Sequence, residues 1–451
     1  MEKIIIIVIS VLVLVILYKA YTLNFGKIKI FTISSFFIFS YIAFAYLGSI
    51  LLNLFEFQME INLGLYNRRD ILFLQWELTT YSLIFVFIGI YITKHIWSNF
   101  DLRLVYNKAV TKKISFYPSL ASNYSFVIFL TIFLLSILTL IIYRSKLGQL
   151  PIEMILSGNV EDKALSLVRS DATNNFSGKL YRYFLFIEGI PMLIFIVISF
   201  IKDIGKKQWV YLYIFLFTYN AFVSIMTLEK APLLKFLILC VIIYFFKRKE
   251  ISIKLLLKLG LFFTPLIVLM YFQFMGQDSL SFIKIIEIAS HRIFIGSIEP
   301  LFWYIKYVDE YGLLYGLSFP NPAGIFSFEH FPLTVEISKY AGYTIAGTGI
   351  IGSMPTVFLG EWYVNFGLVG VMIGSVIFGF IIQTTEFFIL VKMAKNKSIF
   401  IVSIFIYYIQ YFSQFAETSM SIIFFDPKFY LPIIVSIFLK SLILKKSYGL
   451  Q

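Results

Sequence analysis

Residues 4–17 read IIIIVISVLVLVIL, an apolar run interrupted by a single polar residue, Ser10. Comparable runs recur along all 451 residues of the chain, which is 59% hydrophobic and has a mean hydropathy of +0.87. Each run approaches the roughly 20 residues that a helix needs to cross the hydrocarbon core of a bilayer. Only helices and closed barrels satisfy their backbone polar groups in lipid. Because the runs are continuous and do not alternate, they predict an all-α membrane protein with many spans.

The limits of these runs predict about eleven transmembrane helices, with a range of ten to twelve. No small-residue cleavage site follows the first run, so it is expected to be a retained span. No soluble domain is expected beside the spans, so residues 1–451 are interpreted as one membrane domain. The predicted spans cover residues 3–20, 28–54, 71–97, 122–143, 181–201, 209–228, 231–246, 251–274, 362–390, 399–417 and 429–444.

Lysine and arginine gather in the short connections after the third, fifth, seventh and ninth spans and at the C-terminus. Such basic connections are typical of the cytoplasmic side of a membrane. The C-terminus is therefore expected inside and, with eleven spans, the N-terminus outside. This bias accounts for the net charge of +13 without a nucleic-acid partner.

Two long connections, residues 144–180 and 275–361, are then expected on the outer side, and the second is predicted to be partly helical. Long connections in a compact protein are usually functional or disordered. The cytoplasmic connections are too short for a nucleotide-binding domain, and the chain has no phosphate loop of the GxxxxGK[ST] type. Any chemistry is therefore expected on the outer face, without ATP.

Three arginines, Arg169, Arg182 and Arg292, fall in or beside the outer connections, where basic residues are disfavoured. The planar guanidinium group binds two phosphate oxygens at once, so these residues are candidates for an anionic ligand. The alternative is pairing with local acids, for example Arg292 with Glu299. Neither alternative is excluded by the sequence.

A lysine, Lys230, follows Glu229 in MTLEKAPLLKF, at the expected outer boundary of the sixth and seventh spans. Its ammonium group can hold a phosphate as a point charge. It can equally neutralise Glu229.

The second outer connection contains SHRIFIGSIEP, residues 290–300, in which His291 follows Glu287 by one helical turn. A histidine oriented by a carboxylate is a plausible general base for a hydroxyl, and a structural histidine is the alternative. Glu299 and Glu361 are the acids to consider, because Glu361 lies where the ninth span begins and an ionisable residue there is costly. Its alternative role is that of an acid in the first turn of a helix.

Neither a metal site nor a cofactor is predicted. The three histidines are scattered without ligand spacing, and the outer connections hold no DxD pair. The single cysteine, Cys240, lies in an apolar run and excludes an internal disulfide.

The stretch GSMPTVFLGEWYVNFGLVGVMIGSVIFG, residues 352–379, resembles the late-span signature of bacterial O-antigen and capsular repeat-unit polymerases of the Wzy type. The similarity lies in a Gly-Glu-x-Tyr entry, a following Asn-Phe-Gly and a glycine-spaced helix. Lys230-Ala-Pro-Leu-Leu and His291-Arg292-Ile-Phe resemble two further short motifs of that family, and the span organisation agrees over most of the chain. Some members carry an Arg-x10-Gly motif in each outer loop, whereas here Gly178 follows Arg169 by nine positions and Gly296 follows Arg292 by four.

The resemblance implies a metal-independent glycosyltransferase of the bacterial inner membrane that acts on its periplasmic face. Donor and acceptor would both be oligosaccharides linked to undecaprenyl diphosphate, and a chain-length regulator and a flippase are candidate protein partners. The implied roles are cations for the leaving diphosphate (Arg169, Arg292, Lys230 and Arg182), catalytic groups (His291, Glu361 and Glu299) and sugar-contacting aromatics (Trp303, Tyr304 and Trp362).

Two other classes of protein stay open at this point. An O-antigen ligase uses the same kind of donor with a different acceptor. A lipid-linked oligosaccharide flippase moves such a molecule without chemistry, but the related halves and mid-membrane ionisable residues that are typical of transporters are not evident in the sequence.

Overall fold

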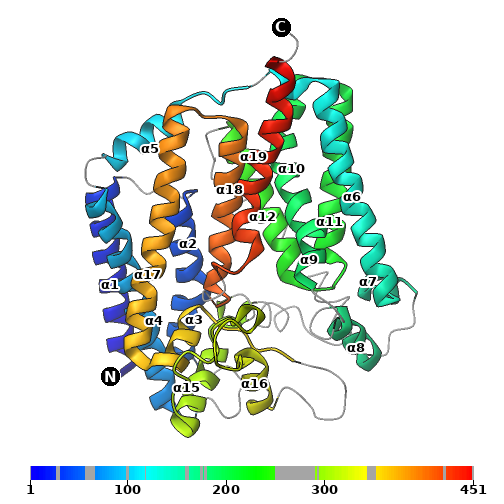
Figure 1. Cartoon of the computed structure of the whole chain (residues 1–451). Helices are drawn as coiled ribbons and strands as arrows, with labels where there is room; N and C mark the ends of the chain where they lie inside the picture. Colours follow the sequence, from blue (N-terminus) through cyan, green and yellow to red (C-terminus); the bar gives the residue numbers. More distant parts are fainter. Residues whose placement is uncertain are drawn as a thin grey trace.

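The computed structural model of the chain describes residues 2–26, 31–55, 67–97, 101–116, 118–157, 162–172, 176, 180–248, 290–291, 294–342, 352–419 and 423–448. In these ranges the protein is helical, and the one β-bridge joins Ser115 and Ser398 (Figure 1). The long helices are α1 (Glu2–Phe25), α2 (Ile33–Tyr41) continued through the π-turn η1 (Ile42–Tyr46) into α3 (Leu47–Leu54), α4 (Arg69–Ile96), α6 (Asn123–Leu147), α9 (Leu180–Phe184) continued through the π-turn η4 (Leu185–Gly189) into α10 (Ile190–Ile201), α11 (Lys207–Ile225), α12 (Lys230–Arg248), α17 (Leu359–Lys395), α18 (Ile399–Ser413) and α19 (Pro427–Tyr448). The shorter helices are α5 (Leu102–Thr111), α7 (Pro151–Leu156), α8 (Asp162–Ala172), α15 (Pro300–Tyr311) and α16 (Leu333–Tyr340).

Eight helical segments of the described chain are long and apolar enough to cross a bilayer, so the protein is a polytopic helical membrane protein. The predicted spans 231–246 and 429–444 correspond to α12 and α19, which are not among these eight. The predicted span 251–274 lies outside the described residues. The number eleven therefore stays a prediction. The predicted ninth span, residues 362–390, belongs to the longer helix α17 of 37 residues.

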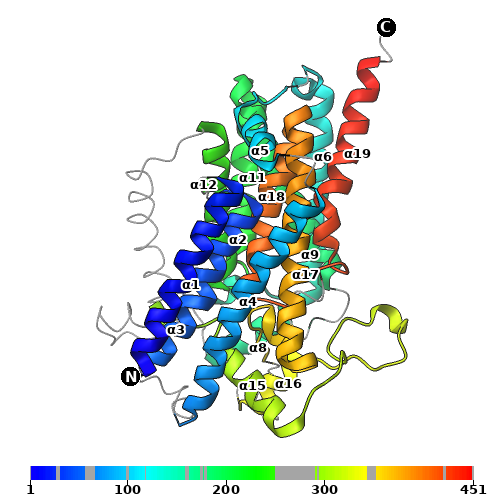
Figure 2. The same cartoon turned by 90° about the vertical axis from the view of Figure 1, so that its left-hand side faces the viewer.

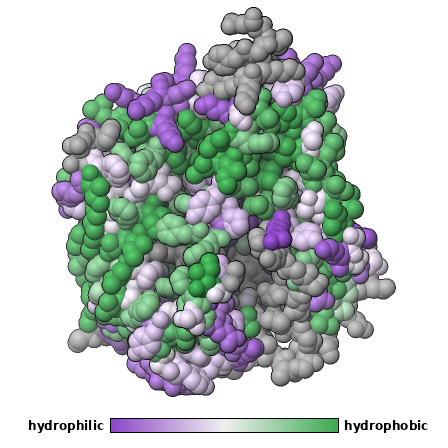
Figure 3. Space-filling view, viewed as in Figure 1, coloured by the Kyte–Doolittle hydropathy of each residue, from purple (hydrophilic) through white to green (hydrophobic). Residues whose placement is uncertain are grey.

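The bundle has two chemically different ends (Figures 1 and 2). Helices α7, α8, α15 and α16 and the N-terminus lie at one end, named the loop end here. Helix α5 and the C-terminus lie at the opposite end, named the basic end, where Lys112 Nζ donates to the carbonyl of Ala394 at 3.2 Å and Lys206 Nζ to that of Ala121 at 2.8 Å. A broad hydrophobic surface separates the two polar ends (Figure 3).

Helix α17 packs closely against α4 because glycines face the partner backbone at two places. A Cβ atom at Gly89 would collide with the carbonyl oxygen of Val376, and one at Gly379 with that of Val86. Small residues of this kind let membrane helices approach until their backbones touch. This contact fixes the position of α17 against α4, and therefore the position of the part of α17 that lies at the loop end.

A kink in α17 attaches the connection 313–332 to the bundle. Gly367 breaks the helix with φ 63° and ψ −150°, a conformation open to glycine. The break leaves the carbonyls of Val364 and Asn365 without helical donors, and they accept hydrogen bonds from the N–H groups of Leu314 at 3.0 Å and Tyr315 at 3.1 Å. Residues 313–332 then loop outward from the side of the bundle (Figure 2).

Helix α17 also carries a buried acid toward the basic end. The carboxylate of Glu386 accepts hydrogen bonds from the backbone N–H of Ser34 at 2.7 Å and from its hydroxyl at 2.8 Å. Ser34 lies in the first turn of α2, whose N-cap is Thr32. An acid at a helix N-terminus is favourable because it faces unpaired N–H groups and the positive end of the helix dipole. Glu386 therefore holds the start of α2 against α17.

Candidate functional site

A cavity of about 340 Å³ lies toward the loop end, where η4, α10, the turn between α11 and α12, α18 and α19 meet. Its wall carries two lysines, two glutamates, two tyrosines and several smaller polar groups, so it is named the charged cavity here. The residues used below are Glu188, Glu229, Lys235, Tyr407, Tyr411 and Lys428.

Two ion pairs hold the lysines of the charged cavity. Lys428 Nζ lies 2.8 Å from Glu188 Oε2, although the two residues are 240 positions apart in the chain. Lys235 Nζ lies 2.9 Å from Glu417 Oε2. An oriented pair of this kind keeps each ammonium group in place at the cavity wall, where a phosphate oxygen could take the position of the carboxylate.

A further acid near the cavity, Asp426, is also held in place by hydrogen bonds. The hydroxyl of Tyr411 donates to Asp426 Oδ2 at 3.0 Å, and the backbone N–H of Lys428 donates to Oδ1 at 2.9 Å. Asp426 therefore caps the start of α19 and positions Lys428 at the cavity.

The turn between α11 and α12 presents Glu229 to the charged cavity. The preceding residue, Leu228, is 6% exposed. Its backbone φ is 59°, which is rare for a residue other than glycine. The N–H of Ile152 in α7 donates to the carbonyl of Met226 at 3.2 Å and pins the turn. Burial raises the pKa of the Glu229 carboxyl, and the charges of Arg169 and Lys235 offset part of this rise.

Glu361, in the first turn of α17, is 6% exposed and joins three segments. The hydroxyl of Ser318 donates to Glu361 Oε1 at 3.2 Å, and that of Ser419 contacts Oε2. Asn365, one turn along the helix, donates to the hydroxyl of Ser318 at 2.7 Å. The carboxylate therefore serves to hold the connection 313–332, α17 and the segment after α18 together.

A second pocket, of about 440 Å³, lies between the connection 313–332, α17 and residues 423–425. Its wall is almost entirely apolar, and it is named the aromatic pocket here. The rings of Phe319 and Trp362 meet edge to face with their centroids 5.2 Å apart. A Cβ atom at Gly374 would collide with the indole of Trp362, so that glycine leaves room for the ring. The remaining aromatic members are Tyr315, Phe326, Phe328, Phe424 and Phe425.

The segment of residues 414–428, which forms the connection between α18 and α19 and the start of α19, serves both pockets. It supplies Glu417, Asp426 and Lys428 to the ion pairs and hydrogen bonds of the charged cavity. It supplies Ser419 to Glu361, and residues 423–425 to the aromatic pocket. Residues 420–422 within it lie outside the described chain. The sequence did not indicate this segment as part of a site, although acids and a lysine among aromatics between two apolar runs were the available signal.

The predicted catalytic residues His291 and Glu299 lie elsewhere, beside each other. His291 Nε2 is 3.5 Å from Glu299 Oε2, and both side chains are buried. Their segment is held against the helices near the N-terminus, because Gln75 Nε2 donates to the carbonyl of Ile298 at 2.6 Å and Gly48 contacts the carbonyl of Phe294. Neither His291 nor Glu299 lines the charged cavity or the aromatic pocket.

The predicted cations are distributed around the loop end. Arg169 is exposed on α8 and acts electrostatically on Glu229. Arg182 is exposed on α9, two turns before Glu188. Lys230 is the first residue of α12 and follows Glu229, but its side chain lies outside the description, as does the whole of Arg292. The charged cavity adds Lys235 and Lys428, which were not predicted.

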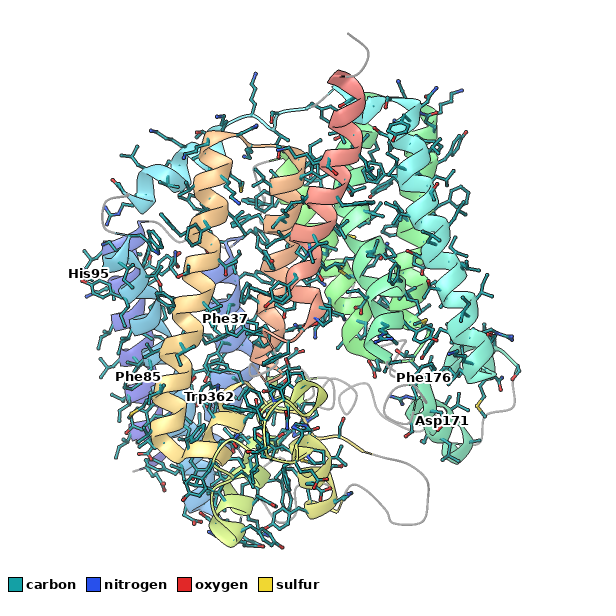
Figure 4. The ribbon with its side chains drawn as sticks, in the orientation of Figure 1. Phe37, Phe85, His95, Asp171, Phe176 and Trp362 are labelled. Carbon is teal, nitrogen blue, oxygen red and sulfur yellow. The ribbon has the colours of Figure 1, made fainter. Side chains whose placement is uncertain are left out.

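The three predicted aromatics separate. Trp362 lines the aromatic pocket, and Figure 4 shows it on α17 at the same end of the molecule as Asp171 of α8. Tyr304 is 2% exposed and donates to the carbonyl of Met354 at 2.9 Å, so its ring faces are covered by protein. Trp303 packs edge to face on Tyr340 with ring centroids 6.2 Å apart and lines neither pocket.

In the described part of the chain, no group of three or more histidine, cysteine, aspartate or glutamate residues is arranged to hold a metal ion. No protein-family model, curated protein or solved structure matches the chain. The site must therefore be interpreted from its own chemistry. It combines a cavity lined by two lysines and two glutamates with an apolar, aromatic pocket that shares the segment 414–428.

Proposed function

We propose that the protein is a repeat-unit polymerase of the O-antigen or capsular type. It would join oligosaccharides linked to undecaprenyl diphosphate into a long chain on the periplasmic face of the bacterial inner membrane. The observation that carries the proposal is the pairing of a charged cavity with an aromatic pocket, both built on the same segment, residues 414–428.

The substrate has three chemically different parts, and the two pockets offer matching groups. The diphosphate needs cations, which Lys235 and Lys428 supply at the wall of the charged cavity. The sugar hydroxyls need hydrogen-bonding partners, which the tyrosines and glutamines of the same wall provide. The isoprenoid chain needs apolar surface, which the aromatic pocket beside Trp362 provides.

The chemistry of glycosyl transfer to a hydroxyl fits such a site. The leaving diphosphate develops charge as the bond to the anomeric carbon breaks, and preorganised cations stabilise that charge. Holding donor and acceptor side by side removes much of the entropic barrier. The ion pairs with Glu188 and Glu417 hold the two ammonium groups in position before a phosphate arrives.

The proposed location follows from charge. Lysines gather at the basic end, and basic connections are retained on the cytoplasmic side of a membrane. The loop end, with both pockets, would then face the periplasm, where lipid-linked repeat units are joined.

Complementation tests the proposal. The full chain is expressed in its host strain after deletion of the chromosomal copy, and the surface glycan is separated on a gel. A restored ladder of chain lengths is expected, whereas the deletion strain shows single repeat units only. Single units in the complemented strain, with the protein present in the membrane, contradict a polymerase. Loss of every transferred unit on deletion would instead indicate a ligase or a flippase.

A further inference from the structure

We propose that Glu229 is the general base of the charged cavity and takes the proton from the acceptor sugar hydroxyl. This inference rests on the proposed function and assigns a role that neither the motifs nor the resemblance suggested. Three observations carry it: the free position of its carboxylate, the backbone that presents it and the charges that face it.

The other acids around the cavity are engaged. Glu188 pairs with Lys428, Glu417 pairs with Lys235, and Asp426 accepts hydrogen bonds from Tyr411 and from the backbone of Lys428. Among the residues that the structure describes, none forms a hydrogen bond or ion pair with the Glu229 carboxylate, which lines the cavity. A general base must contact the proton that it removes, so this carboxylate is the one placed to do so.

The earlier candidates for the base are less suitable. The carboxylate of Glu361 is occupied by the hydroxyls of Ser318 and Ser419. His291 is buried beside Glu299 and lines neither pocket. We therefore assign both residues a structural role at the loop end.

The residue before Glu229 has a strained backbone conformation. Leu228 has φ 59° and is buried, and its N–H donates to the carbonyl of Ile225 at 2.9 Å. Such conformations persist where the surrounding structure demands them, and they are frequent at functional sites. Here the contact of Met226 with Ile152 of α7 holds the turn, so that Glu229 follows it into the cavity.

The charges that face Glu229 suit a group that binds and releases a proton. Burial and the carboxylate of Glu188 raise its pKa, whereas Arg169 of α8 and Lys235 of α12 lower it. The net effect is a pKa above the ordinary range of a glutamate. A higher pKa makes the carboxylate a stronger base while it stays ionised above that value.

The proposed step transfers the donor sugar from its lipid diphosphate to the acceptor hydroxyl. The acceptor oxygen forms a bond to the anomeric carbon of the donor sugar, and its proton passes to the Glu229 carboxylate. The bond between the anomeric carbon and the phosphate oxygen breaks, and its electron pair leaves with the lipid diphosphate, whose charge Lys235 and Lys428 face. Glu229 then returns the proton to water.

Glu229→Gln in the full chain, reconstituted in proteoliposomes, is the test. The probe is the lipid-linked repeat unit purified from the host strain that lacks its own copy of the protein. The variant is expected to lose at least about 100-fold in polymerisation rate with little change in KM, because a positioned general base contributes on the order of 10²–10⁴ in rate. Glu229→Asp should recover part of the rate.

The pH profile separates a base from a structural residue. The wild-type rate should fall as the pH drops through a value above the ordinary carboxyl pKa, because protonated Glu229 cannot accept a proton. The residual rate of Glu229→Gln should lack that fall. Glu336→Gln, which removes a half-buried acid paired with Lys339 on α16, is the matched control and should keep the wild-type rate.

Two results would overturn the assignment in different ways. If the wild type forms polymer and Glu229→Gln keeps its rate and pH profile, the role of Glu229 is wrong and the polymerase proposal stands. If the wild type forms no polymer from this probe, the polymerase proposal and the role of Glu229 both fail. Equal membrane amounts and melting temperatures of variant and wild type exclude misfolding as the cause of any loss.

Discussion

The charged cavity and the aromatic pocket draw wall residues from the same segment but have opposite chemistry. The cavity is lined by groups whose positions depend on ion pairs between distant parts of the chain, such as Glu188 with Lys428. The pocket is lined by rings whose positions depend on local backbone, namely the kink at Gly367 and the space left by Gly374. Both use the segment 414–428 as a wall. The difference indicates a division of tasks, in which the cavity acts on charge and the pocket binds apolar surface.

The largest effect is expected from removing a cation of the cavity. Lys428→Met should lower polymerisation by about 100-fold or more, since loss of one preorganised group at a developing charge costs on the order of 10²–10³ in rate. Polymer length and rate in proteoliposomes are the measurements.

Lys428→Met also leaves Glu188 without its ion-pair partner, and such a change can destabilise the protein. The double variant Glu188→Gln/Lys428→Met controls for this effect because it removes both charges. It should accumulate and melt like the wild type and still form no polymer. A double variant with a wild-type rate would show that the cavity does not carry out the reaction.

A smaller effect is expected from the aromatic pocket. Trp362→Ala should raise the KM for the lipid-linked substrate roughly tenfold, which corresponds to about 1.4 kcal/mol of lost apolar contact, and should change kcat little. Trp303→Ala, which removes an indole outside both pockets, is the matched control. A fall in kcat with unchanged KM would contradict the division of tasks between the pockets.

The space that Gly374 leaves for the indole of Trp362 can be tested by measuring the stability of variants. Gly374→Ala places a Cβ against the indole and should cost about 1–3 kcal/mol by overpacking. Thermal unfolding in detergent measures the loss. In a Trp362→Ala background the same glycine substitution should cost little further stability, because the ring that causes the collision is gone. Equal losses with and without the indole would contradict this packing.

The smallest effect on activity is expected at His291. His291→Gln disturbs a buried pair with Glu299, so the melting temperature should fall. The rate per folded molecule should stay within about twofold of the wild type, because a residue away from the reacting groups contributes little to the barrier. Loss of polymer without loss of stability would return His291 to the catalytic groups.

The sequence was sufficient to predict the helical membrane class, and it marked the helix on which Glu361 and Trp362 lie. Apolar runs such as residues 4–17 mark α1, and the glycines of residues 352–379 mark the kinked helix that carries Glu361 and Trp362. These features depend on hydrophobicity, glycine conformation and spacing within one helix, and all three are visible in a single sequence.

The charged cavity could not be predicted because its contacts are not local. Lys428 reaches Glu188 across 240 positions, and no periodicity relates the two residues. Residue type favoured the arginines and the motif His291-Arg292, whereas the cavity is lined by lysines near the starts of α12 and α19. Glu229 was considered mainly as a neighbour of Lys230, since only the fold shows that its turn opens into a cavity.

The most direct test of the central claim is polymerisation by the purified chain in proteoliposomes supplied with the lipid-linked repeat unit alone, compared with Glu188→Gln/Lys428→Met. The account predicts a ladder of chain lengths and release of lipid diphosphate from the wild type, and neither from the equally stable double variant. No ladder from the wild type, or the same ladder from both proteins, would contradict it.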